Sequence, residues 1–260
     1  MKIGLIGCGN IGQFLLKSLN VDGFLDGSQI DAVFVRNKEG YEDLSHRYST
    51  SFYDDFQTFL QSDVDLVIEA ATVQSVQQYA REIIKHGKDL LIISVGALAD
   101  SSFFDELKAL SELNGKKVYL PSGAIGGLDV LKATQLTGQL DSVTLTTRKP
   151  AASLTDEPVE SELVLFDGSA FEAIRKFPKN INVSIILSLA GIGVERTRVK
   201  IVADANVNKN IHFIEAKGSF GKLTLNIENN PMPNNPKTSY LAALSVLSSL
   251  KDSHEMLEIG

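Results

Sequence analysis

The stretch Gly7-Cys8-Gly9-Asn10-Ile11-Gly12 decides the fold of this 260-residue chain. It follows residues 2–6, an apolar run typical of a short buried strand, and apolar residues then recur at helical spacing over residues 11–19. In a turn of this kind the first glycine permits the bend, the second lets the main chain approach a diphosphate, and the third lets the helix pack on the strand. The sequence therefore predicts a dinucleotide site rather than merely a tight turn. Its predicted contacts are Gly7, Gly9, Asn10, Ile11 and Gly12.

The composition is that of a soluble globular protein, with 43% hydrophobic and 22% charged residues, which excludes disordered and fibrous classes. A net charge of -7 without a cluster of Lys and Arg excludes a basic footprint for nucleic acid, so we expect a small-molecule ligand. The single cysteine permits no internal disulfide, and no Cys or His cluster has the spacing of a metal site, so no metal is expected. Without a signal peptide or an apolar run of membrane-spanning length, we expect a cytoplasmic protein without a membrane partner.

Strand-like and helix-like segments alternate over the first half of the chain. Buried strands are predicted at residues 30–35, 65–71, 88–95 and 116–120. Helices are predicted at residues 54–61, 75–85 and 100–113. This alternation is typical of a doubly wound, parallel sheet with helices on both faces, an α/β fold. We expect residues 1–121 to form a dinucleotide-binding domain of the Rossmann type.

Small or polar residues follow the predicted strands at the edge where open α/β sheets bind ligands. Ala70, Ala71 and Thr72 follow one strand, and residues 94–97 and 122–123 follow two others, so together they predict one cofactor crevice.

Arg36 and Asn37 follow the second strand, where sites selective for NAD carry an acidic residue that holds the ribose hydroxyl. An Arg at this place can pair with the 2′-phosphate of NADP, whereas no carboxylate is present to repel it. We expect NADP to be accepted, with NAD as a second cofactor. The alternative is a surface Arg at a strand end.

The pattern changes after Pro121, and we expect residues 122–235 to form a substrate domain. Helices are predicted at residues 128–133, 169–176 and 183–190, and strands at 142–147 and 162–166. Three further strands, at 194–202, 210–217 and 222–228, are joined by short turns, which favours a mixed, mostly antiparallel sheet with helices on one face. Residues 229–236 are predicted to be a rigid connector. The segment 236–260 carries a helix at 238–250 whose leucine stripe, Leu241, Leu244, Leu247 and Leu250, is expected to pack back on the first domain.

Taken together, these segments resemble the L-aspartate dehydrogenase family over essentially the whole chain. The matching stretches are Gly7-Cys8-Gly9-Asn10-Ile11-Gly12, Glu69-Ala70-Ala71, Ser94-Val95-Gly96-Ala97-Leu98, Ser122-Gly123-Ala124-Ile125-Gly126, Phe177-Pro178-Lys179-Asn180-Ile181-Asn182-Val183, His212 with Gly218-Ser219-Phe220-Gly221, and Asn235-Pro236-Lys237-Thr238-Ser239. The first stretch is common to many dehydrogenases, and the later ones are far more specific. One departure is Thr72, where the family pattern has Ser, and the hydroxyl is kept.

The resemblance implies NAD(P)-dependent oxidation of L-aspartate to iminoaspartate, then to oxaloacetate and ammonia, and a role in supplying the imine to NAD biosynthesis. It also implies a Rossmann domain joined to an α/β substrate domain, in a homodimer. The catalytic histidine of the family corresponds to His212, and its nicotinamide contacts correspond to Ala124 and Asn182.

His212 also stands apart from the other three histidines by its position. Alternation along the strand 210–217 places it on one face with Asn210, Ile214 and Ala216, a mixed face suited to lining a cleft. The other three lie in a charged helical stretch, at a helix end and in the tail. An imidazole could take a proton as water adds to the imine and return one to departing ammonia. The alternative is a half-buried histidine held by a structural hydrogen bond.

The two carboxylates of aspartate require donors or cations in a buried site. Thr238 and Ser239 are predicted to open the last helix, where free N–H groups suit an anion, and Lys237 adds charge. Asn180 is a further candidate, although Asn180 and Asn182 could equally cap the helix that follows them. Arg148 and Lys149, at a strand end, form a second candidate pair. For all of these charged and hydroxyl groups, a solvated surface position is the alternative.

Two other kinds of function stay open from the sequence. One is another two-domain reductase, of the homoserine dehydrogenase or dihydrodipicolinate reductase type. The second of these would require a basic substrate loop with paired histidines, which the sequence lacks. The other kind is a regulator that senses NADP without catalysing a reaction.

Overall fold

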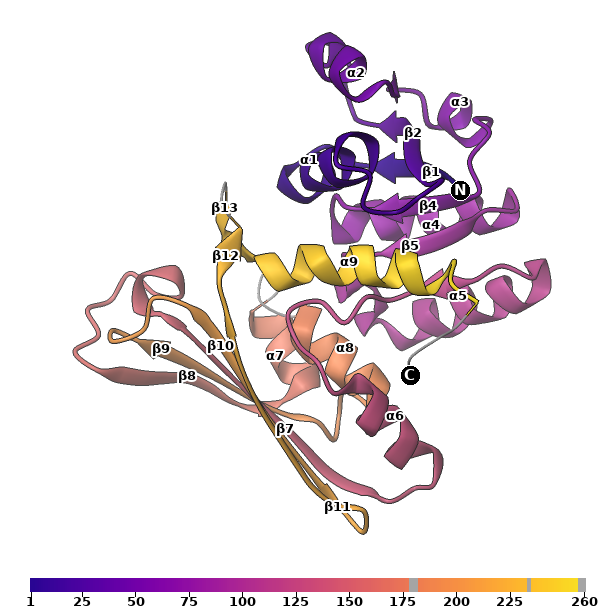
Figure 1. Ribbon diagram of the computed structural model, residues 1–260. Coiled ribbons are helices and arrows are strands. Elements are labelled where there is room, and N and C mark those ends of the chain that lie inside the picture. Colours follow the sequence, from indigo (N-terminus) through magenta and orange to yellow (C-terminus); the bar gives the residue numbers. More distant parts are fainter. Residues whose placement is uncertain (178–181, 233–234, 257–260) are drawn as a thin grey trace. The chain divides into compact units, whose positions relative to one another are not determined.

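The computed structural model describes residues 1–177, 182–232 and 235–256, and only the backbone of residues 235–237 (Figure 1). The chain forms two compact units. The first contains Met1–Pro121 and the end of the last helix from Val246 on, and the second contains Ser122–Ser245.

The first unit is built on a six-stranded sheet in the order β3-β2-β1-β4-β5-β6. Its strands are β1 (Lys2–Ile6), β2 (Gln29–Phe34), β3 (Ser51–Tyr53), β4 (Leu66–Glu69), β5 (Asp89–Ile92) and β6 (Val118–Tyr119). All neighbouring pairs are parallel. The order changes direction between β1 and β4, so the predicted doubly wound parallel sheet is confirmed. Strand β3 was not predicted from the sequence.

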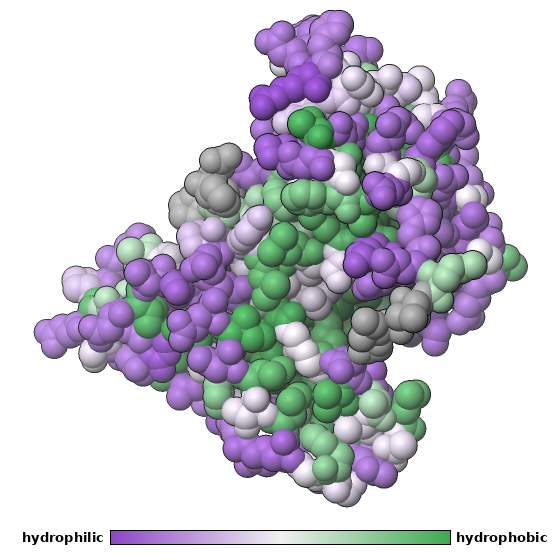
Figure 2. Space-filling model, viewed as in Figure 1, coloured by the Kyte–Doolittle hydropathy of each residue, from purple (hydrophilic) through white to green (hydrophobic). Residues whose placement is uncertain are grey.

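Helices connect these strands. They are α1 (Asn10–Leu16), continued by a π-helical turn (Lys17–Val21), α2 (Glu42–Tyr48), α3 (Phe56–Leu60), α4 (Val73–Lys85), a 3-10 turn (Val95–Ala99) and α5 (Ser101–Asn114). Asp55, Thr72 and Asp100 precede α3, α4 and α5, and each side chain accepts a backbone N–H of the first turn. Figure 2 shows a largely hydrophilic surface at the top of the view, over α2, which fits the charged sequence of that helix.

The last helix, α9 (Tyr240–Asp252), ends inside the core of the first unit. Val246, Leu247 and Leu250 join a cluster that includes Ile3 and Leu5 of β1. The predicted leucine stripe is wrong in part, because Leu244 is 37% exposed. An α-helix has 3.6 residues per turn, so residues that repeat every three positions do not stay on one face of it. Residues three, four and seven positions after Ala243 do lie on the same face as Ala243. The buried apolar residues of α9 follow that second spacing and are Ala243, Val246, Leu247 and Leu250.

The second unit is built on a five-stranded sheet in the order β11-β10-β7-β9-β8. Its strands are β7 (Leu140–Pro150), β8 (Glu162–Ser169), β9 (Arg198–Asp204), β10 (Asn210–Gly218) and β11 (Gly221–Asn229). The pair β7 and β9 is parallel, and the other pairs are antiparallel. The predicted mixed, mostly antiparallel sheet is therefore confirmed, although β9 lies beside β7 rather than beside β10.

Helices α6 (Leu128–Leu136), α7 (Ala170–Lys176) and α8 (Asn182–Ala190) gather on one side of this sheet, and a 3-10 turn (Ala151–Ser153) follows β7 (Figure 1). Burial alternates along β7, where Val143, Leu145 and Thr147 are buried and the intervening residues are partly exposed. This alternation is expected of a sheet with one covered face. None of the helices within the described ranges is long and apolar enough to cross a membrane.

The prediction of a rigid connector at residues 229–236 is wrong. Two short strands, β12 (Pro231–Met232) and β13 (Asn235–Ser239), pair antiparallel there. Helix α9 consequently begins at Tyr240, two residues later than predicted. The N–H of Tyr240 donates to the Asn230 carbonyl at 2.9 Å. Thr238 and Ser239 therefore lie in a strand and do not open the helix.

Candidate active site

The glycine-rich loop between β1 and α1 has little free space around two of its glycines. Gly7 has a φ of +92°, and a Cβ there would lie 2.8 Å from the Cβ of Ala71. A Cβ on Gly12 would lie 2.5 Å from the carbonyl oxygen of Gly7. Around Gly9, in contrast, a Cβ would meet nothing within 4 Å. The first glycine thus serves the turn, the third serves the packing of helix on strand, and the second leaves open space next to the main chain.

The start of α1 lies at this open space. Gly9 is the N-cap residue, in an extended conformation, and it offers no side-chain acceptor to the N–H groups of the first turn. Gly9 and Asn10 are exposed, and Ile11 is half-buried. Uncapped N–H groups together with the helix dipole favour an anion. The residues of this loop therefore fit the diphosphate of NAD(P).

The loop lies at the carboxyl ends of the strands where the order of the sheet changes direction, between β1 and β4. This is the position at which open α/β sheets bind their ligands. The Gly7 N–H donates to the carbonyl of Phe34 at 2.9 Å, which ties the loop to the end of β2. Arg36 and Asn37 follow β2 and are exposed. The predicted cofactor residues that follow β4 lie at the same edge and are Ala70, Ala71 and Thr72.

Glu69, at the end of β4, was not among the predicted site residues. Its carboxylate is 1% exposed and accepts the N–H of Ala71 at 2.8 Å, the N–H of Ser94 at 3.0 Å and the hydroxyl of Ser94 at 3.0 Å. Burial raises the pKa of Glu69 against the opposing effect of these hydrogen bonds. Glu69 therefore links the loops that follow β4 and β5. The signal in the sequence was an acidic residue at the end of an otherwise apolar strand.

In the second unit, Ala124 lies in a loop that is held by residues far along the chain. The side chain of Asn229, 3% exposed, donates to the Ala124 carbonyl at 3.0 Å. The Ser239 hydroxyl donates to the Asn229 side-chain oxygen at 2.7 Å. Ser245 Oγ accepts the Gly123 N–H at 3.1 Å. The loop before α6 is thus positioned by residues of β11, β13 and α9. The hydroxyl hydrogen of Ser239 is donated to Asn229 within the protein.

His212 is buried on the helix-covered face of the second sheet. It lies on β10 directly opposite Thr147 of β7, and Thr147 Oγ1 is 3.1 Å from His212 Nδ1. His212 is 4% exposed. Burial, and after it the positive charge of Lys149, lowers the pKa of His212 to about 3. The imidazole is therefore neutral at physiological pH, as an acceptor of protons must be.

The candidate pair Arg148 and Lys149 is divided between the two faces of the sheet, because successive residues of a strand point in opposite directions. Arg148 forms ion pairs with Asp204 of β9 and Glu162 of β8. Lys149 shares the face of Thr147 and His212, and burial lowers its pKa. Of the two cations, Lys149 is the one placed near the candidate base.

The remaining predicted substrate and cofactor residues are distributed as follows. Asn182 is the first residue of α8 and is exposed, and Thr238 is half-buried in β13. Asn180 lies outside the described residues, as does the side chain of Lys237.

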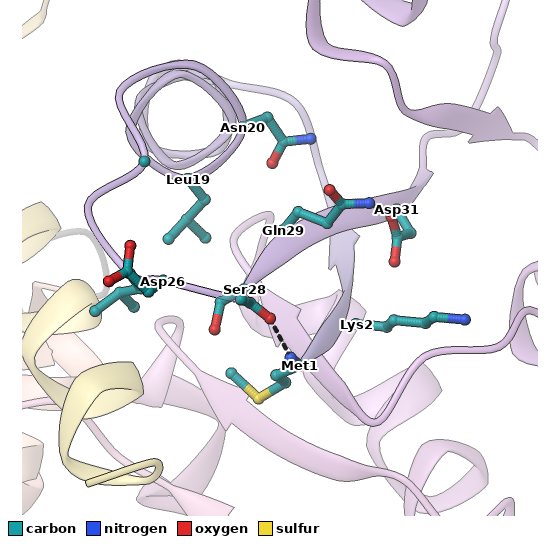
Figure 3. Close-up of a pocket in the computed structure, with 11 residues that line it drawn as sticks. Met1, Lys2, Leu19, Asn20, Asp26, Ser28, Gln29 and Asp31 are labelled. Atoms are coloured by element: carbon teal, nitrogen blue, oxygen red, sulfur yellow. Dashed lines mark hydrogen bonds between the residues drawn. The ribbon is translucent and has the colours of Figure 1, made fainter.

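A separate pocket of about 480 Å³ opens at the other edge of the first sheet (Figure 3). It is lined by residues at the amino ends of β1 and β2, among them Lys2 and Gln29, and the Met1 amino group donates to the Gly27 carbonyl beside it. Because cofactors of doubly wound sheets bind at the carboxyl ends, this pocket is distinct from the glycine-rich loop. Within the described residues, His, Cys, Asp and Glu side chains do not gather in threes as they do around a metal ion.

Models of known protein families match both units of the chain. A family model described as "Aspartate dehydrogenase, C-terminal" matches residues 129–253, and one described as "Homoserine dehydrogenase, NAD binding domain" matches residues 7–121. L-aspartate dehydrogenase of Methanocaldococcus jannaschii is 41% identical over 269 residues, covering 100% of this chain and 99% of the relative. L-aspartate dehydrogenase of Methanospirillum hungatei is 44% identical over 260 residues, with the same coverage.

Solved structures agree with this match. The crystal structure of aspartate dehydrogenase from Thermotoga maritima has a TM-score of 0.83 at 31% identity, covering 100% of this chain and 99% of that one. A putative myo-inositol dehydrogenase from Sinorhizobium meliloti has a TM-score of 0.60 at 14% identity, covering 100% and 91%, which supports the fold alone.

Proposed function

Because this chain belongs to the aspartate dehydrogenase family, we propose that it catalyses the NAD(P)-dependent oxidation of L-aspartate. The observation that carries the proposal is the identity of 41–44% to L-aspartate dehydrogenases along the full chain. In the proposed reaction, L-aspartate loses a hydride and a proton to give iminoaspartate. Water then adds to the imine, and oxaloacetate and ammonia leave. The same steps run in reverse when ammonia and oxaloacetate are supplied.

The first unit is the proposed binding site of the cofactor. When bound, the nicotinamide supplies the acceptor for the hydride from Cα of aspartate. The diphosphate fits the open space at Gly9 and the uncapped start of α1. Further cofactor contacts in this unit are assigned to Asn10, Ile11, Asn37, Ala70, Ala71 and Thr72, and Ala124 and Asn182 of the second unit are assigned to the nicotinamide on the basis of the family resemblance.

His212 is the proposed acid and base of the hydrolytic step. Its neutral imidazole can take a proton from water as the oxygen bonds to the imine carbon, and can return a proton to the departing ammonia. Thr147, bonded to Nδ1, orients the ring so that the other nitrogen is the one available for proton transfer. Thr238 remains a candidate for binding substrate. The Ser239 hydroxyl is engaged with Asn229, which supports a structural role for Ser239.

Arg36 supports acceptance of NADP, because its exposed guanidinium follows β2 in the place where sites selective for NAD carry an acid. We propose use of both cofactors. Delivery of iminoaspartate to NAD biosynthesis, assembly as a homodimer and a cytoplasmic location stay predictions from the sequence.

The proposal is tested by following the absorbance of the reduced cofactor with L-aspartate, D-aspartate, L-glutamate and L-homoserine, each with NAD and with NADP. Of the four amino acids, we expect L-aspartate to be the one that is turned over. The oxidation is expected to be faster at alkaline pH, because only a neutral amine becomes an imine. The family model of the first unit makes L-homoserine the important comparison. Turnover with homoserine but not aspartate would overturn the assignment, and binding of NADPH without any turnover would favour a regulator.

A further inference from the structure

The loop after β2 gathers charged side chains at the ligand-binding edge of the first sheet. Strands β2 and β3 are parallel neighbours with Phe34 opposite Tyr53, and the Val35 N–H donates to the Tyr53 carbonyl at 2.9 Å. Arg36 and Asp54 directly follow the two residues of this bond. Neighbouring strands lie about 4.8 Å apart, so Arg36 and Asp54 leave the sheet within reach of one ligand group.

Lys38 returns to the same edge from further along the loop. Its ammonium nitrogen lies 3.3 Å from Asp54 Oδ1. The backbone turns on both sides of Lys38. The Glu39 N–H donates to Asn37 Oδ1 at 2.9 Å, and the Tyr41 N–H donates to the carbonyl of Lys38 at 3.2 Å. The turn and the ion pair together hold the Lys38 ammonium beside the carboxyl ends of β2 and β3.

The ion pair of Lys38 and Asp54 is exposed to solvent. The side chain of Lys38 is 56% exposed, and that of Asp54 is 38% exposed. Water screens such a pair, so it adds little to the stability of the fold. A phosphate monoester carries a charge of about −1.5 to −2 at neutral pH, and it attracts an ammonium more strongly than a single carboxylate does. The ammonium can therefore move from Asp54 to a phosphate bound beside it at little cost.

The other acidic side chains near this loop have different places. Asp55 caps α3 with its side chain, and Glu42 and Asp43 lie in the first turn of α2. Within the part of the chain that the structure describes, Asp54 is the acid that pairs with Lys38. A ligand that takes the ammonium of Lys38 consequently has Asp54 as its competitor.

We propose that Lys38 binds the 2′-phosphate of NADP together with Arg36, and that Asp54 competes with this phosphate for the Lys38 ammonium. The guanidinium of Arg36 offers a planar fork to the phosphate oxygens, and Lys38 adds a second positive charge. NAD has a hydroxyl in place of the phosphate and therefore gains nothing from Lys38. That the ligand is a dinucleotide rests on the proposed function. Asp54 then sets how strongly NADP is preferred over NAD.

The test compares NADPH with NADH in fluorescence titrations of the full chain. Lys38→Met is expected to weaken NADPH binding about tenfold, the effect of one charge-assisted hydrogen bond, and to leave NADH binding unchanged. Lys38→Arg keeps the charge and is expected to recover most of the NADPH affinity. Asp54→Asn is expected to strengthen NADPH binding about threefold without an effect on NADH, because the competing carboxylate is removed.

The matched control is the exposed ion pair of Lys85 and Glu82 on α4, in the same unit, with 3.1 Å between its charged atoms. Lys85→Met and Glu82→Gln are expected to leave both affinities unchanged. Circular dichroism and the NADH affinity show whether each variant is folded.

Three results would overturn the proposal. One is an unchanged NADPH affinity in folded Lys38→Met. Another is a wild type that binds NADH but not NADPH. The third is weaker NADH binding by Asp54→Asn with unchanged NADPH binding, because Asp54 would then hold the ribose hydroxyl of NAD and would not compete with the phosphate.

A second readout separates contact with the phosphate from a general change in the loop. Calorimetric titrations with adenosine 2′,5′-bisphosphate and adenosine 5′-monophosphate compare two ligands that differ in the 2′-phosphate alone. In Lys38→Met the bisphosphate is expected to lose affinity and the monophosphate to keep it. The affinity for the bisphosphate is also expected to depend less on salt than in the wild type, since one charge contact is missing. Equal losses for the two ligands would mean that Lys38 shapes the loop and does not bind the phosphate.

The outcomes for Lys38 and for the proposed function are distinguishable. Turnover of L-aspartate with NADP at an unchanged cofactor KM in Lys38→Met would remove the role of Lys38 and leave the dehydrogenase function. Absence of turnover in the wild type, with NADPH binding that depends on Lys38, would remove the dehydrogenase function and leave the phosphate site.

Discussion

At the scale of single residues, Glu69 joins the two loops after β4 and β5 that are proposed to line the cofactor site. Replacing it with Gln puts an amide group where a carboxylate oxygen accepts an N–H, so one donor faces another. A buried donor without an acceptor costs about 1–3 kcal/mol. We expect Glu69→Gln to weaken NADH binding about tenfold, which corresponds to about 1.4 kcal/mol, with little change in kcat at saturating cofactor.

Fluorescence titration with NADH measures this effect, and Glu112→Gln is the control, because Glu112 is exposed on α5 in the same unit. Equal affinities in the two variants would mean that Glu69 does not position the loops.

His212 provides a pH-dependent prediction at the same scale. Its pKa is about 3 in the folded protein and near 6.5 when the chain is unfolded, so between these values the unfolded state binds the extra proton. The contribution of His212 to stability is therefore present above pH 6.5 and is lost as the pH falls toward 3, at up to about 1.4 kcal/mol per pH unit. His212→Gln is expected to lose less stability than the wild type over this range.

Urea unfolding at a series of pH values measures the difference, with His254→Gln in the exposed tail as the control. An identical decline in the wild type and in His212→Gln would contradict the neutral, buried state of the imidazole.

At the scale of elements, the loop between β1 and α1 contains one glycine that is needed for folding and another that is proposed to serve cofactor binding. These are Gly12 and Gly9, respectively. Gly12→Ala is expected to destabilise the first unit, because its Cβ would lie 2.5 Å from the backbone carbonyl oxygen of Gly7, a residue whose N–H is hydrogen-bonded to the end of β2. Gly9→Ala meets no protein atom within 4 Å, so its melting temperature should stay within a degree or two of the wild type. Its affinity for NAD(P)H should nevertheless fall more than tenfold, because the Cβ would occupy the space proposed for the diphosphate.

Thermal unfolding and NADPH titration of both variants check this contrast. Normal NADPH binding by Gly9→Ala would show that the diphosphate lies elsewhere.

The elements themselves could be predicted where their pattern is local. Strand β1 matches its predicted bounds, and β10 and β11 differ from theirs by one residue at one or both ends, because alternation and turn residues define them. Strand β3 could not be predicted from its three residues, which are too few to display a period. The short strands β12 and β13 contain prolines that favour an irregular segment, and only their mutual hydrogen bonds establish a ladder.

At the scale of the whole molecule, α9 belongs to both units. Its first residues lie in the second unit, whereas Leu250, fully buried, completes the core of the first. We expect Leu250→Ala to lower the free energy of unfolding by about 2–5 kcal/mol. Leu244→Ala, at a partly exposed position of the same helix, is expected to cost less than about 1 kcal/mol.

Urea denaturation of the two variants measures these costs. Equal losses would mean that the end of α9 is not part of the core of the first unit.

By itself the sequence determined the two kinds of sheet, the glycine-rich loop at a strand end and the family, because each is encoded in residues that lie near one another along the chain. Only the tertiary structure decided which neighbours these residues meet. Ser94 reaches Glu69 across 25 residues, and Asn229 reaches Ala124 across 105. The opposite environments of Arg148 and Lys149 likewise depend on which strands flank β7. Local periodicity tells which face a side chain shares, but burial, charge and hydrogen-bond partners arise only when distant segments pack together.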